Sequence, residues 1–334
     1  MSDELERVSV DGKVHDAQRL KELQSLPLWR KIQITQTRII EWYQYYEGKV
    51  YIAFSGGKDS TVLVNIARKI YPDIECVFVD TGLEYSSVRD FVKTIENVIW
   101  LKSEMRFDEV IKKYGYPLIS KEVSRDVSVA KRNPNGKTAK RFERDSDYCK
   151  KYGDRYCLER YKYLLDAPFD ISNQCCNVMK KKPSKKYGKD TKKHTIIATM
   201  ATESNLRKQD WFKTGCNAFE NENPQSKPMS FWTENDVLEY IDTYKIPYAN
   251  VYGEIIRDEK GKYKTTGLNR TGCVFCGFGC QSEKSPTRFE QLKEIDRPKW
   301  EYCMRPIEEN GLGMGAVLDY INVKWGKEEN IKDK

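Results

Sequence analysis

The sequence predicts an α/β protein built on a parallel sheet with helices on both faces. Two short apolar, β-prone runs, residues 50–54 and 74–79, are each followed by a segment whose apolar residues recur at helical spacing. Strands that alternate with helices along a chain form a parallel sheet covered on both faces. Ligands of such sheets bind beyond the carboxyl ends of the strands, where the strand order reverses.

The composition bounds the class of protein. A length of 334 residues allows one large or two modest domains with a real core. No run of eighteen apolar residues exists, and residues 1–7 lack the features of a signal peptide, so we expect a cytoplasmic protein without a membrane partner. In the cytoplasm, ten cysteines favour metal or redox chemistry over disulfides, and with only two histidines any metal site depends on cysteine.

We expect three parts along the chain. Residues 1–47 form an N-terminal arm and an amphipathic helix, residues 48–252 a nucleotide-binding α/β domain with a basic insertion at about 121–193, and residues 253–334 a hairpin, a cysteine segment and C-terminal helices. Within the second part, residues 98–101 and 195–199 are strand-like, residues 86–96 are helical, and Thr233 with Asp236 forms a capping box that opens another helix.

The turn between the first strand and the first helix of this domain is the strongest motif. It reads Ser55-Gly56-Gly57-Lys58-Asp59-Ser60. Backbone N–H groups at a helix N-terminus and the helix dipole favour an anion, the glycines allow close approach, and Lys58 adds a positive charge. The turn predicts a phosphate or pyrophosphate site, although it is neither a Walker P-loop nor a dinucleotide fingerprint.

A second polar turn follows the second strand, at Asp80-Thr81-Gly82. Because it falls at the same edge of a parallel sheet, we expect Asp80 to approach a ribose, a magnesium ion or the polar edge of a nucleotide. A simple helix-capping turn is the alternative.

Two segments carry many positive charges. Residues 121–163 are rich in Lys and Arg with interleaved aromatic residues, and residues 180–193 contain eight lysines. With the net charge of +8, they indicate either a surface for tRNA or DNA or a solvated face.

Five cysteines form a further constellation. Cys175 and Cys176 are adjacent, and Cys273-x-x-Cys276 follows about a hundred residues later. The four thiolates predict a metal centre, with a [4Fe-4S] cluster preferred and zinc as the alternative, because vicinal cysteines suit tetrahedral zinc poorly. Cys280 is a fifth candidate, either as a substitute ligand or as a free thiol that carries sulfur. Inert buried cysteines are the remaining interpretation.

These motifs give the chain a resemblance to the PAPS (3′-phosphoadenylyl sulfate) reductase family of the PP-loop superfamily, over about residues 47–281. Besides the turns at 55–60 and 80–82, the resemblance includes Thr202-Glu203-Ser204-x-x-Arg207 and residues 228–236. The cysteine pattern is similar to the cluster signature of APS (adenylyl sulfate) reductases.

The resemblance implies a Rossmann-like, HUP-type sheet and an adenine nucleotide, either ATP or APS/PAPS, at the PP-loop. By resemblance, Ser55 to Ser60 hold phosphates, Asp80, Thr81 and Gly82 lie at the nucleotide, and Arg207 with Glu203 holds an anionic group. A [4Fe-4S] cluster on Cys175, Cys176, Cys273 and Cys276 lies near the reactive phosphate.

One departure from the family pattern shapes the functional hypothesis. Sulfonucleotide reductases of this family use a nucleophilic cysteine in a C-terminal Glu-Cys-Gly-Leu-His segment, and this sequence has no cysteine after Cys303. We therefore expect an ATP-dependent, adenylating sulfurtransferase that thiolates a nucleic acid or a nucleotide. Sulfonucleotide reduction, with Cys280 or Cys303 as nucleophile, is the runner-up, and a non-catalytic binding component of a larger complex is the third hypothesis.

In the leading hypothesis, a substrate oxygen attacks the α-phosphate of ATP, pyrophosphate leaves, and sulfur displaces AMP. Lys58, Asp59, Asp80 and Arg207 form the charged machinery, and Mg²⁺ is expected to assist. A cysteine desulfurase as sulfur donor, or a thioredoxin-like reductant, is the expected protein partner. We expect the PP-loop and the four thiols to face a single cavity.

Overall fold

The computed structural model describes residues 15–327, and this part of the chain forms two compact units. The first unit contains the described residues up to Asp80 together with 86–101 and 184–271. The second contains residues 81–85, 102–183 and those from 272 onward.

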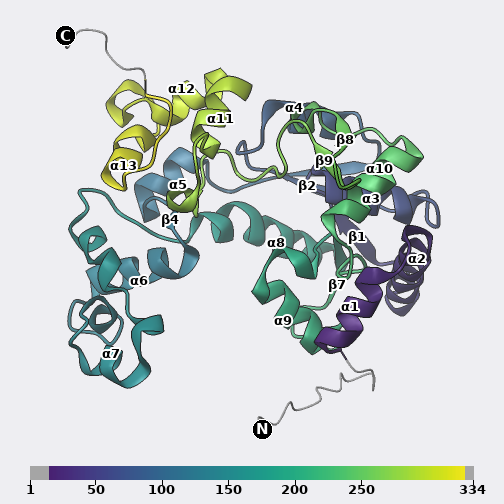
Figure 1. The fold of residues 1–334 in the computed structure, drawn as a ribbon, viewed down its shortest axis with the longest axis horizontal. Helices are drawn as coiled ribbons and strands as arrows, with labels where there is room; N and C mark the ends of the chain where they lie inside the picture. The colour runs from purple at the N-terminus through teal and green to yellow at the C-terminus, as the bar shows by residue number, and fades with distance from the viewer. Residues whose placement is uncertain (1–14, 328–334) are drawn as a thin grey trace. The chain divides into compact units, whose positions relative to one another are not determined.

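The first unit is an α/β unit with one six-stranded sheet (Figure 1). The strands lie in the order β3-β2-β1-β5-β7-β6. Strand β1 pairs in parallel with both β2 and β5, β5 pairs in parallel with β7, and β6 runs antiparallel to β7. Their bounds are β1 Val50–Ala53, β2 Cys76–Asp80, β3 Val98–Lys102, β5 His194–Ile197, β6 Asn217–Ala218 and β7 Gln225–Ser226. Because the chain builds outward from β1 to β3 and then returns to the other side of β1, the strand order reverses at the carboxyl end of β1.

Helices cover both faces of this sheet, as the alternation of strands and helices predicted. Helices α2 (Leu28–Tyr45), α3 (Lys58–Arg68) and α10 (Glu234–Tyr244) pack against one another, whereas α8 (Lys182–Thr191) reaches the sheet through the ring of Tyr187 against Tyr51. The remaining helical elements of this unit are α1 Ala17–Ser25, α4 Ser86–Lys93, η5 Ala201–Glu203, α9 Asn205–Thr214 and η6 Asn250–Tyr252. The hairpin predicted at the start of residues 253–334 is confirmed as β8 Ile255–Arg257 and β9 Tyr263–Thr265.

Local sequence signals placed most elements of the first unit correctly. Thr233 caps α10 by accepting a hydrogen bond from the backbone N–H of Asp236, whose carboxylate accepts one from Thr233 in return, so the capping box is confirmed. Cys76 is fully buried in β2, as its strand pattern suggested. The expected N-terminal arm lies partly outside the described residues, since the structure begins at His15; from there α1 buries Leu20 and α2 buries Ile39 and Trp42.

The second unit is mainly helical and carries all the cysteines of the predicted metal centre. Its elements are α5 Phe107–Tyr114, β4 Leu118–Ile119, α6 Lys121–Arg132, η1 Ala139–Phe142, α7 Asp147–Tyr152, η2 Asp154–Tyr156, η3 Glu159–Asp166, η4 Asn177–Lys181, β10 Gly277–Phe278, η7 Cys280–Ser282, α11 Arg288–Ile295, α12 Arg297–Met304, η8 Ile307–Glu309 and α13 Met314–Tyr320. Strand β10 pairs in parallel with β4, which anchors the Cys273–Cys276 segment beside α6.

One disulfide corrects the expectation that cysteines avoid such bonds in this chain. Cys149 in α7 and Cys157 after η2 are joined by a disulfide that closes a short loop of the basic insertion. The sequence assigned no role to either residue. None of the helices in residues 15–327 is both long and apolar enough to span a bilayer.

Of the two glycines in the turn after β1, Gly56 is the one that the packing of the fold requires. Its φ is +70°, and an added Cβ would lie 2.6 Å from Cγ2 of Val92 and 2.8 Å from Cγ1 of Val88 in α4. A side chain here would meet both a left-handed backbone and a closely packed helix.

We therefore expect Gly56→Ala to lower the free energy of unfolding by about 2–4 kcal/mol, from backbone strain and overpacking together. Gly261→Ala is the matched control, since Gly261 has φ +74° but nothing within 4 Å of an added Cβ, and only the backbone cost of about 1–2 kcal/mol applies. Urea unfolding of both variants measures the difference. Equal destabilisation would show that contact with α4 contributes nothing.

Candidate functional site

The turn after β1 is a nest of backbone N–H groups that hydroxyl oxygens occupy. The N–H of Gly57 donates to Oγ of Ser55 (3.3 Å), and the N–H of Lys58 donates to the hydroxyl of Tyr252 (3.2 Å). Oγ of Ser60 accepts from the N–H of Ser55 (3.3 Å) and lies 3.0 Å from Oγ of Ser55. The sequence predicts that these N–H groups bind an anion. In the structure they donate to neutral hydroxyl oxygens, and the phosphate site stays a prediction.

Lys58 is buried in the first turn of α3, with 3% of its side chain exposed. Its ammonium donates to the backbone oxygen of Asn269 (2.9 Å) and lies 3.2 Å from Glu234 and 3.5 Å from Asp59. The two carboxylates and the backbone oxygen hold this buried ammonium in place. The turn therefore places a fixed positive charge beside its N–H groups.

A cluster of one carboxylate and two guanidinium groups stands near the same turn. Glu203 forms ion pairs with both Arg207 and Arg270, and its Oε2 also accepts from the N–H of Met200 (2.8 Å). Burial and then the charge of Arg270 lower the pKa of Arg207, whereas the carboxylate of Asp59 acts in the opposite direction. The structure thus pairs Arg207 with Glu203 within the electrostatic reach of Asp59, and the role of these residues at an anionic group stays a prediction.

Asp80 is the last residue of β2, and its carboxylate is paired with the guanidinium of Arg89. Its carboxylate accepts two hydrogen bonds from the guanidinium of Arg89 in α4, at 2.7 and 3.1 Å. The next two residues belong to the second unit, where the hydroxyl of Thr81 donates to Glu84 (2.8 Å) and Gly82 has φ +72°. The three residues predicted to contact a nucleotide therefore divide between the two units, and a role for Thr81 and Gly82 at the nucleotide stays a prediction.

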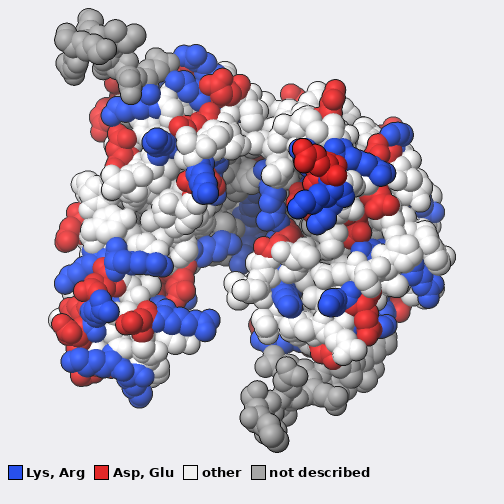
Figure 2. All heavy atoms as spheres, viewed as in Figure 1, with Lys and Arg blue, Asp and Glu red and all other residues white. Residues whose placement is uncertain are grey.

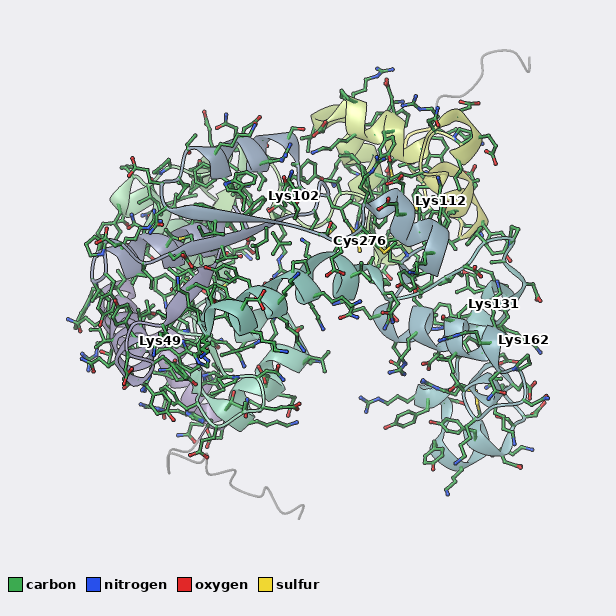
Figure 3. The ribbon with its side chains drawn as sticks, turned by 180° about the vertical axis from the view of Figure 1, so that it is seen from behind. Lys49, Lys102, Lys112, Lys131, Lys162 and Cys276 are labelled. Atoms are coloured by element: carbon green, nitrogen blue, oxygen red, sulfur yellow. A yellow bond between two sulfur atoms is a disulfide. The ribbon has the colours of Figure 1, made fainter. Side chains whose placement is uncertain are left out.

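The four predicted metal-binding thiols line one small cavity of the second unit. Cys175 and Cys176 come from the helical turn before η4, and Cys273 and Cys276 (Figure 3) from the segment before β10. Apolar side chains complete the wall: Leu83, Phe107, Pro117 and Met179. The sequence alone placed these two segments together, although they lie about a hundred residues apart.

Of the four thiols that line this cavity, Cys176 is the one whose pKa its neighbours lower. The Sγ atoms of Cys175 and Cys176 lie 4.0 Å apart, and the hydrogen bond from Cys175, followed by the charges of Lys121, Lys180 and Lys181, lowers the pKa of the Cys176 thiol. Burial lowers the pKa of Lys180, but the neighbouring Cys273 and Glu84 raise it above its usual value, and the ion pair with Glu84 spans 3.4 Å. Burial raises the pKa of Cys276 to about 11.

The cavity as described is smaller than a cluster. Its volume is about 20 Å³, which is room for one water molecule. Within residues 15–327, no group of three or more His, Cys, Asp or Glu side chains is arranged to hold a metal ion. The donor set therefore fits a thiolate-bound centre in its chemistry, while a four-iron cluster requires the two cysteine segments to move apart.

The other free thiols of the described chain are poorly suited to nucleophilic attack. They are Cys76, Cys216, Cys280 and Cys303. Burial raises the pKa of each, to about 12 for Cys280, which is 1% exposed, and well above the usual value for Cys303, which is fully buried. Sγ of Cys280 donates to the backbone oxygen of Gly277 (3.1 Å). A raised pKa lowers the fraction of reactive thiolate, and the catalytic role of Cys280 stays a prediction.

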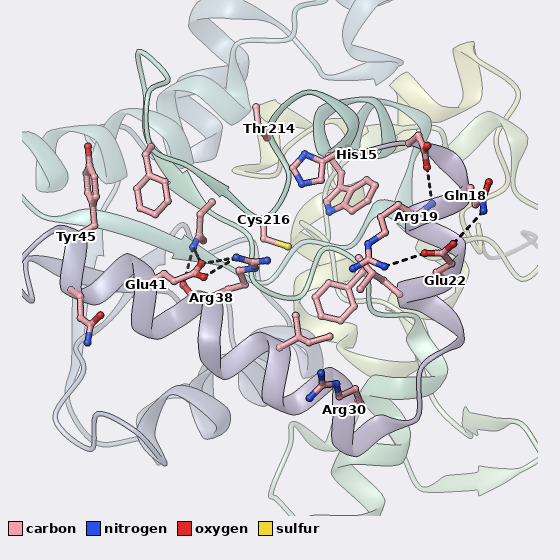
Figure 4. A pocket seen from close by; sticks show the side chains of 18 residues that line it. His15, Gln18, Arg19, Glu22, Arg30, Arg38, Glu41, Tyr45, Thr214 and Cys216 are labelled. Carbon is pink, nitrogen blue, oxygen red and sulfur yellow. Dashed lines mark hydrogen bonds and ion pairs between the residues drawn. The ribbon is translucent and has the colours of Figure 1, made fainter. Parts of the chain in front are cut away.

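A much larger cavity, of about 1230 Å³, opens in the first unit between α1, α2 and the residues around α9 (Figure 4). Its wall mixes aromatic residues such as Trp211 with Arg38 and Glu41, which pair with each other at 2.7 Å. None of the predicted site residues lines it, whereas the half-buried thiol of Cys216 does.

Sequence reasoning missed several residues around the turn and the thiols. Asn269, Arg270 and Thr271 come from the stretch just before Cys273. Tyr252 ends η6, and its hydroxyl lies 2.7 Å from that of Thr271. No local motif marks them, because each acts through its place in the fold. The position of Arg270 directly ahead of the cysteine segment was the one available signal.

Comparison with known proteins defines the class. The family profile of the phosphoadenosine phosphosulfate reductase domain matches residues 49–117 and 102–278, which is more than half of the chain. The chain therefore belongs to the PAPS reductase family, and the resemblance seen in the motifs is confirmed.

Individual relatives are more distant. One uncharacterized protein of Methanocaldococcus jannaschii is 27% identical over 82% of this chain, and the match covers 45% of that protein. A second one is 36% identical over 77% of this chain, and the match covers 48% of that protein. The chain thus spans about half the length of these two relatives. An adenosine 5′-phosphosulfate reductase of Staphylococcus epidermidis is 22% identical over 65% of this chain and 70% of its own. The crystal structure of a Candida auris PAPS reductase in complex with phosphate matches with a TM-score of 0.39 and 14% identity over 74% of this chain and 97% of that one, too distant to transfer site geometry.

Proposed function

We propose that this member of the PAPS reductase family is an ATP-dependent sulfurtransferase whose thiol-lined cavity holds a [4Fe-4S] cluster and whose acceptor is a nucleic acid or a nucleotide. The observation that carries the proposal is the distribution of its thiols. Four converge on one cavity, and burial raises the pKa of each of the other free thiols of residues 15–327, namely Cys76, Cys216, Cys280 and Cys303. Reduction of a sulfonucleotide requires an attacking thiolate outside the cluster ligands, for which this part of the chain offers no good candidate.

The PP-loop supplies the groups that adenylation requires. An acceptor oxygen attacks the α-phosphate of ATP, the bond from that phosphorus to the bridging oxygen breaks, and pyrophosphate leaves. Negative charge that builds on the phosphate oxygens is offset by Lys58 and Arg207, while the N–H groups of Gly57 and Lys58 exchange hydroxyl partners for phosphate oxygens. Mg²⁺ would neutralise further charge on the leaving pyrophosphate. Sulfide then forms a bond to the activated atom of the acceptor, and AMP departs with the oxygen.

The thiol cavity is suited to the sulfur half of the reaction. Cys175, Cys176, Cys273 and Cys276 would hold the cluster, which when bound would supply a place for sulfide. Lys180 balances negative charge on these sulfurs, since it lies beside Cys273 and Glu84. The chain also passes from Thr271, whose hydroxyl meets Tyr252 at the PP-loop, to Cys273 within two residues.

The newly identified Arg270 provides a test at the nucleotide site. Because Arg270 shares Glu203 with Arg207 and is 57% exposed, we expect it to move onto the phosphates of a bound nucleotide. Arg270→Gln should weaken ATP binding about fivefold, on the order of 1 kcal/mol for a half-exposed charge. Isothermal titration calorimetry measures the change, with the exposed hairpin residue in Arg257→Gln as control. Unchanged affinity in Arg270→Gln would remove this arginine from the site.

The proposed acceptor chemistry is tested in cells. Mass spectrometry of nucleic acid from cells with and without the gene should reveal a thionucleoside or a phosphorothioate linkage that depends on the gene. Identical profiles, together with sulfite release from APS or PAPS by the purified protein, would instead establish the reductase activity of the family.

A further inference from the structure

The helix α8 presents a face made only of lysines. Lys182, Lys185, Lys186 and Lys189 are all exposed. At 100° per residue these four positions fall within about 100° of the helix circumference, so their side chains project from one stripe. Figure 2 shows Lys and Arg side chains gathered over the stretch that Figure 1 labels α8.

The stripe is not balanced by acidic neighbours. No ion pair joins any of the four lysines to a residue in the described part of the chain, and Asp190 is the one acidic residue between Lys180 and Lys193. The four lysines make two like-charge pairs at i,i+4 and two at i,i+3, each of which costs a helix about 0.2–0.5 kcal/mol. A helix that keeps such pairs on its exposed face is suited to an anionic partner that neutralises them.

The second basic segment of the sequence, residues 121–163, has more acidic residues among its basic ones. It carries thirteen Lys or Arg but also seven Asp or Glu, against eight Lys and one Asp in residues 180–193. Arg141 of this segment is buried in ion pairs with Asp126 and Glu122. The stripe on α8 is therefore the more concentrated of the two basic surfaces.

The surroundings of the stripe indicate the class of partner. The inward side of α8 is used by Tyr187, whose hydroxyl meets Glu75 and whose ring meets Tyr51, and the helix exposes no large apolar residue. Insertion into a membrane surface requires an apolar face beside the charges, and a protein interface requires buried aromatic or aliphatic anchors. A phosphodiester backbone requires neither, since regularly spaced ammonium groups alone bind it.

From these observations we infer that the stripe of Lys182, Lys185, Lys186 and Lys189 is a binding surface for the sugar–phosphate backbone of a nucleic acid, which is the acceptor of the sulfur transfer proposed above. The inference rests on that proposed function for the role of the bound strand, but not for the binding itself. The position of the stripe in the chain supports the link. The helical run that carries it begins at Cys175 and Cys176, passes through the π-helical turn η4, and continues into α8 without a break. π-Helical turns within helices occur frequently at functional sites.

The test compares two variants of the full-length protein with equal loss of charge. The stripe variant combines Lys182→Gln, Lys185→Gln, Lys186→Gln and Lys189→Gln. The control variant combines Lys150→Gln, Lys151→Gln, Arg155→Gln and Lys162→Gln, four exposed positions of the other basic segment. Glutamine is a good helix former, and its introduction removes like-charge repulsion, so far-ultraviolet circular dichroism should show both variants folded.

Fluorescence anisotropy then measures binding to labelled single-stranded DNA of about 20 nucleotides, to the matching duplex and to bulk tRNA, between about 50 and 200 mM salt. We expect the stripe variant to bind at least tenfold more weakly at about 100 mM salt and to lose about three units of the slope of log K against log salt, since four phosphate contacts are removed. The control variant should stay within about threefold of the wild type, because its four positions lie among acidic residues such as Asp147, Asp154 and Glu159. The three probes identify which nucleic acid is preferred.

Equal weakening of both variants, or no binding by the wild type, would overturn the inference. Tighter binding of the wild type to polyglutamate or to phosphatidylserine vesicles than to any nucleic acid would overturn it as well, in favour of an acidic protein or a membrane. ATP affinity and iron content, measured on the same preparations without nucleic acid, report on the proposed function separately. If the stripe variant binds nucleic acid as the control does while ATP and iron binding are intact, only the inferred surface is refuted.

Discussion

Lys58→Gln should reduce the rate of pyrophosphate release from ATP by about a hundredfold to a thousandfold, the cost of removing one preorganised group that stabilises charge in the transition state. The ammonium of Lys58 is buried and fixed by Asn269, Glu234 and Asp59 at the N-terminus of α3, so water cannot replace it. A coupled assay for pyrophosphate, with the acceptor nucleic acid and sulfide present, measures the rate.

Lys69→Gln is the matched control. Lys69 lies at the opposite end of the same helix, exposed, with its ammonium on the hydroxyl of Tyr240. Its loss should leave the rate within about twofold, because an exposed charge at that distance is screened. A Lys58→Gln enzyme that keeps more than a tenth of the wild-type rate would show that the fixed charge of the PP-loop is not what stabilises the leaving group.

The second large effect concerns the thiol cavity. In anaerobically purified protein we expect about four irons per chain and a broad absorption near ~400 nm, and Cys273→Ser should lower the iron content to less than one per chain. Cys273 supplies one of four sulfurs that line the cavity, and serine does not replace a thiolate as an iron ligand.

Cys280→Ser serves as the control within the same segment. Cys280 is buried outside the cavity, where its Sγ donates to Gly277, and a serine hydroxyl can make the same hydrogen bond. Iron should therefore stay at the wild-type level. Iron lost from Cys280→Ser but retained in Cys273→Ser would show that the assigned ligand set is wrong. Zinc as the one metal in the wild-type protein would show that the thiols hold a structural zinc ion and not a cluster.

Much of the first unit was predictable because its signals are local. The apolar run before Ser55, the helical spacing after it and the capping box at Thr233 each depend on neighbouring residues, and each reappears as β1, α3 and α10. The pairing of Cys175–Cys176 with Cys273–Cys276 was predictable for a different reason, since thiolates in two pairs need a common partner.

What could not be predicted depends on contacts between distant parts of the chain. The hydroxyl of Tyr252 on the N–H of Lys58 joins residues 194 positions apart, and no periodicity marks either end. The Cys149–Cys157 disulfide was missed because the expected compartment argued against it. The turn glycines were assigned to ligand approach, whereas Gly56 is also required by the packing of Val88 and Val92.

The same limit separates the two basic segments. Counted along the sequence, both are rich in Lys and Arg, and only the helical phase of α8 shows that four lysines share one exposed face. In the other segment, acidic residues are interspersed and Arg141 turns inward to Asp126. Charge content was visible in the sequence, but the surface it forms was not.

The most direct test of the proposed chemistry is product analysis on one anaerobic preparation supplied either with ATP, sulfide and nucleic acid or with APS or PAPS and a dithiol reductant. The account predicts AMP and pyrophosphate in equal amounts from the first mixture, with sulfur appearing in the nucleic acid, and no sulfite from the second. Sulfite release from the second mixture without pyrophosphate from the first would contradict it.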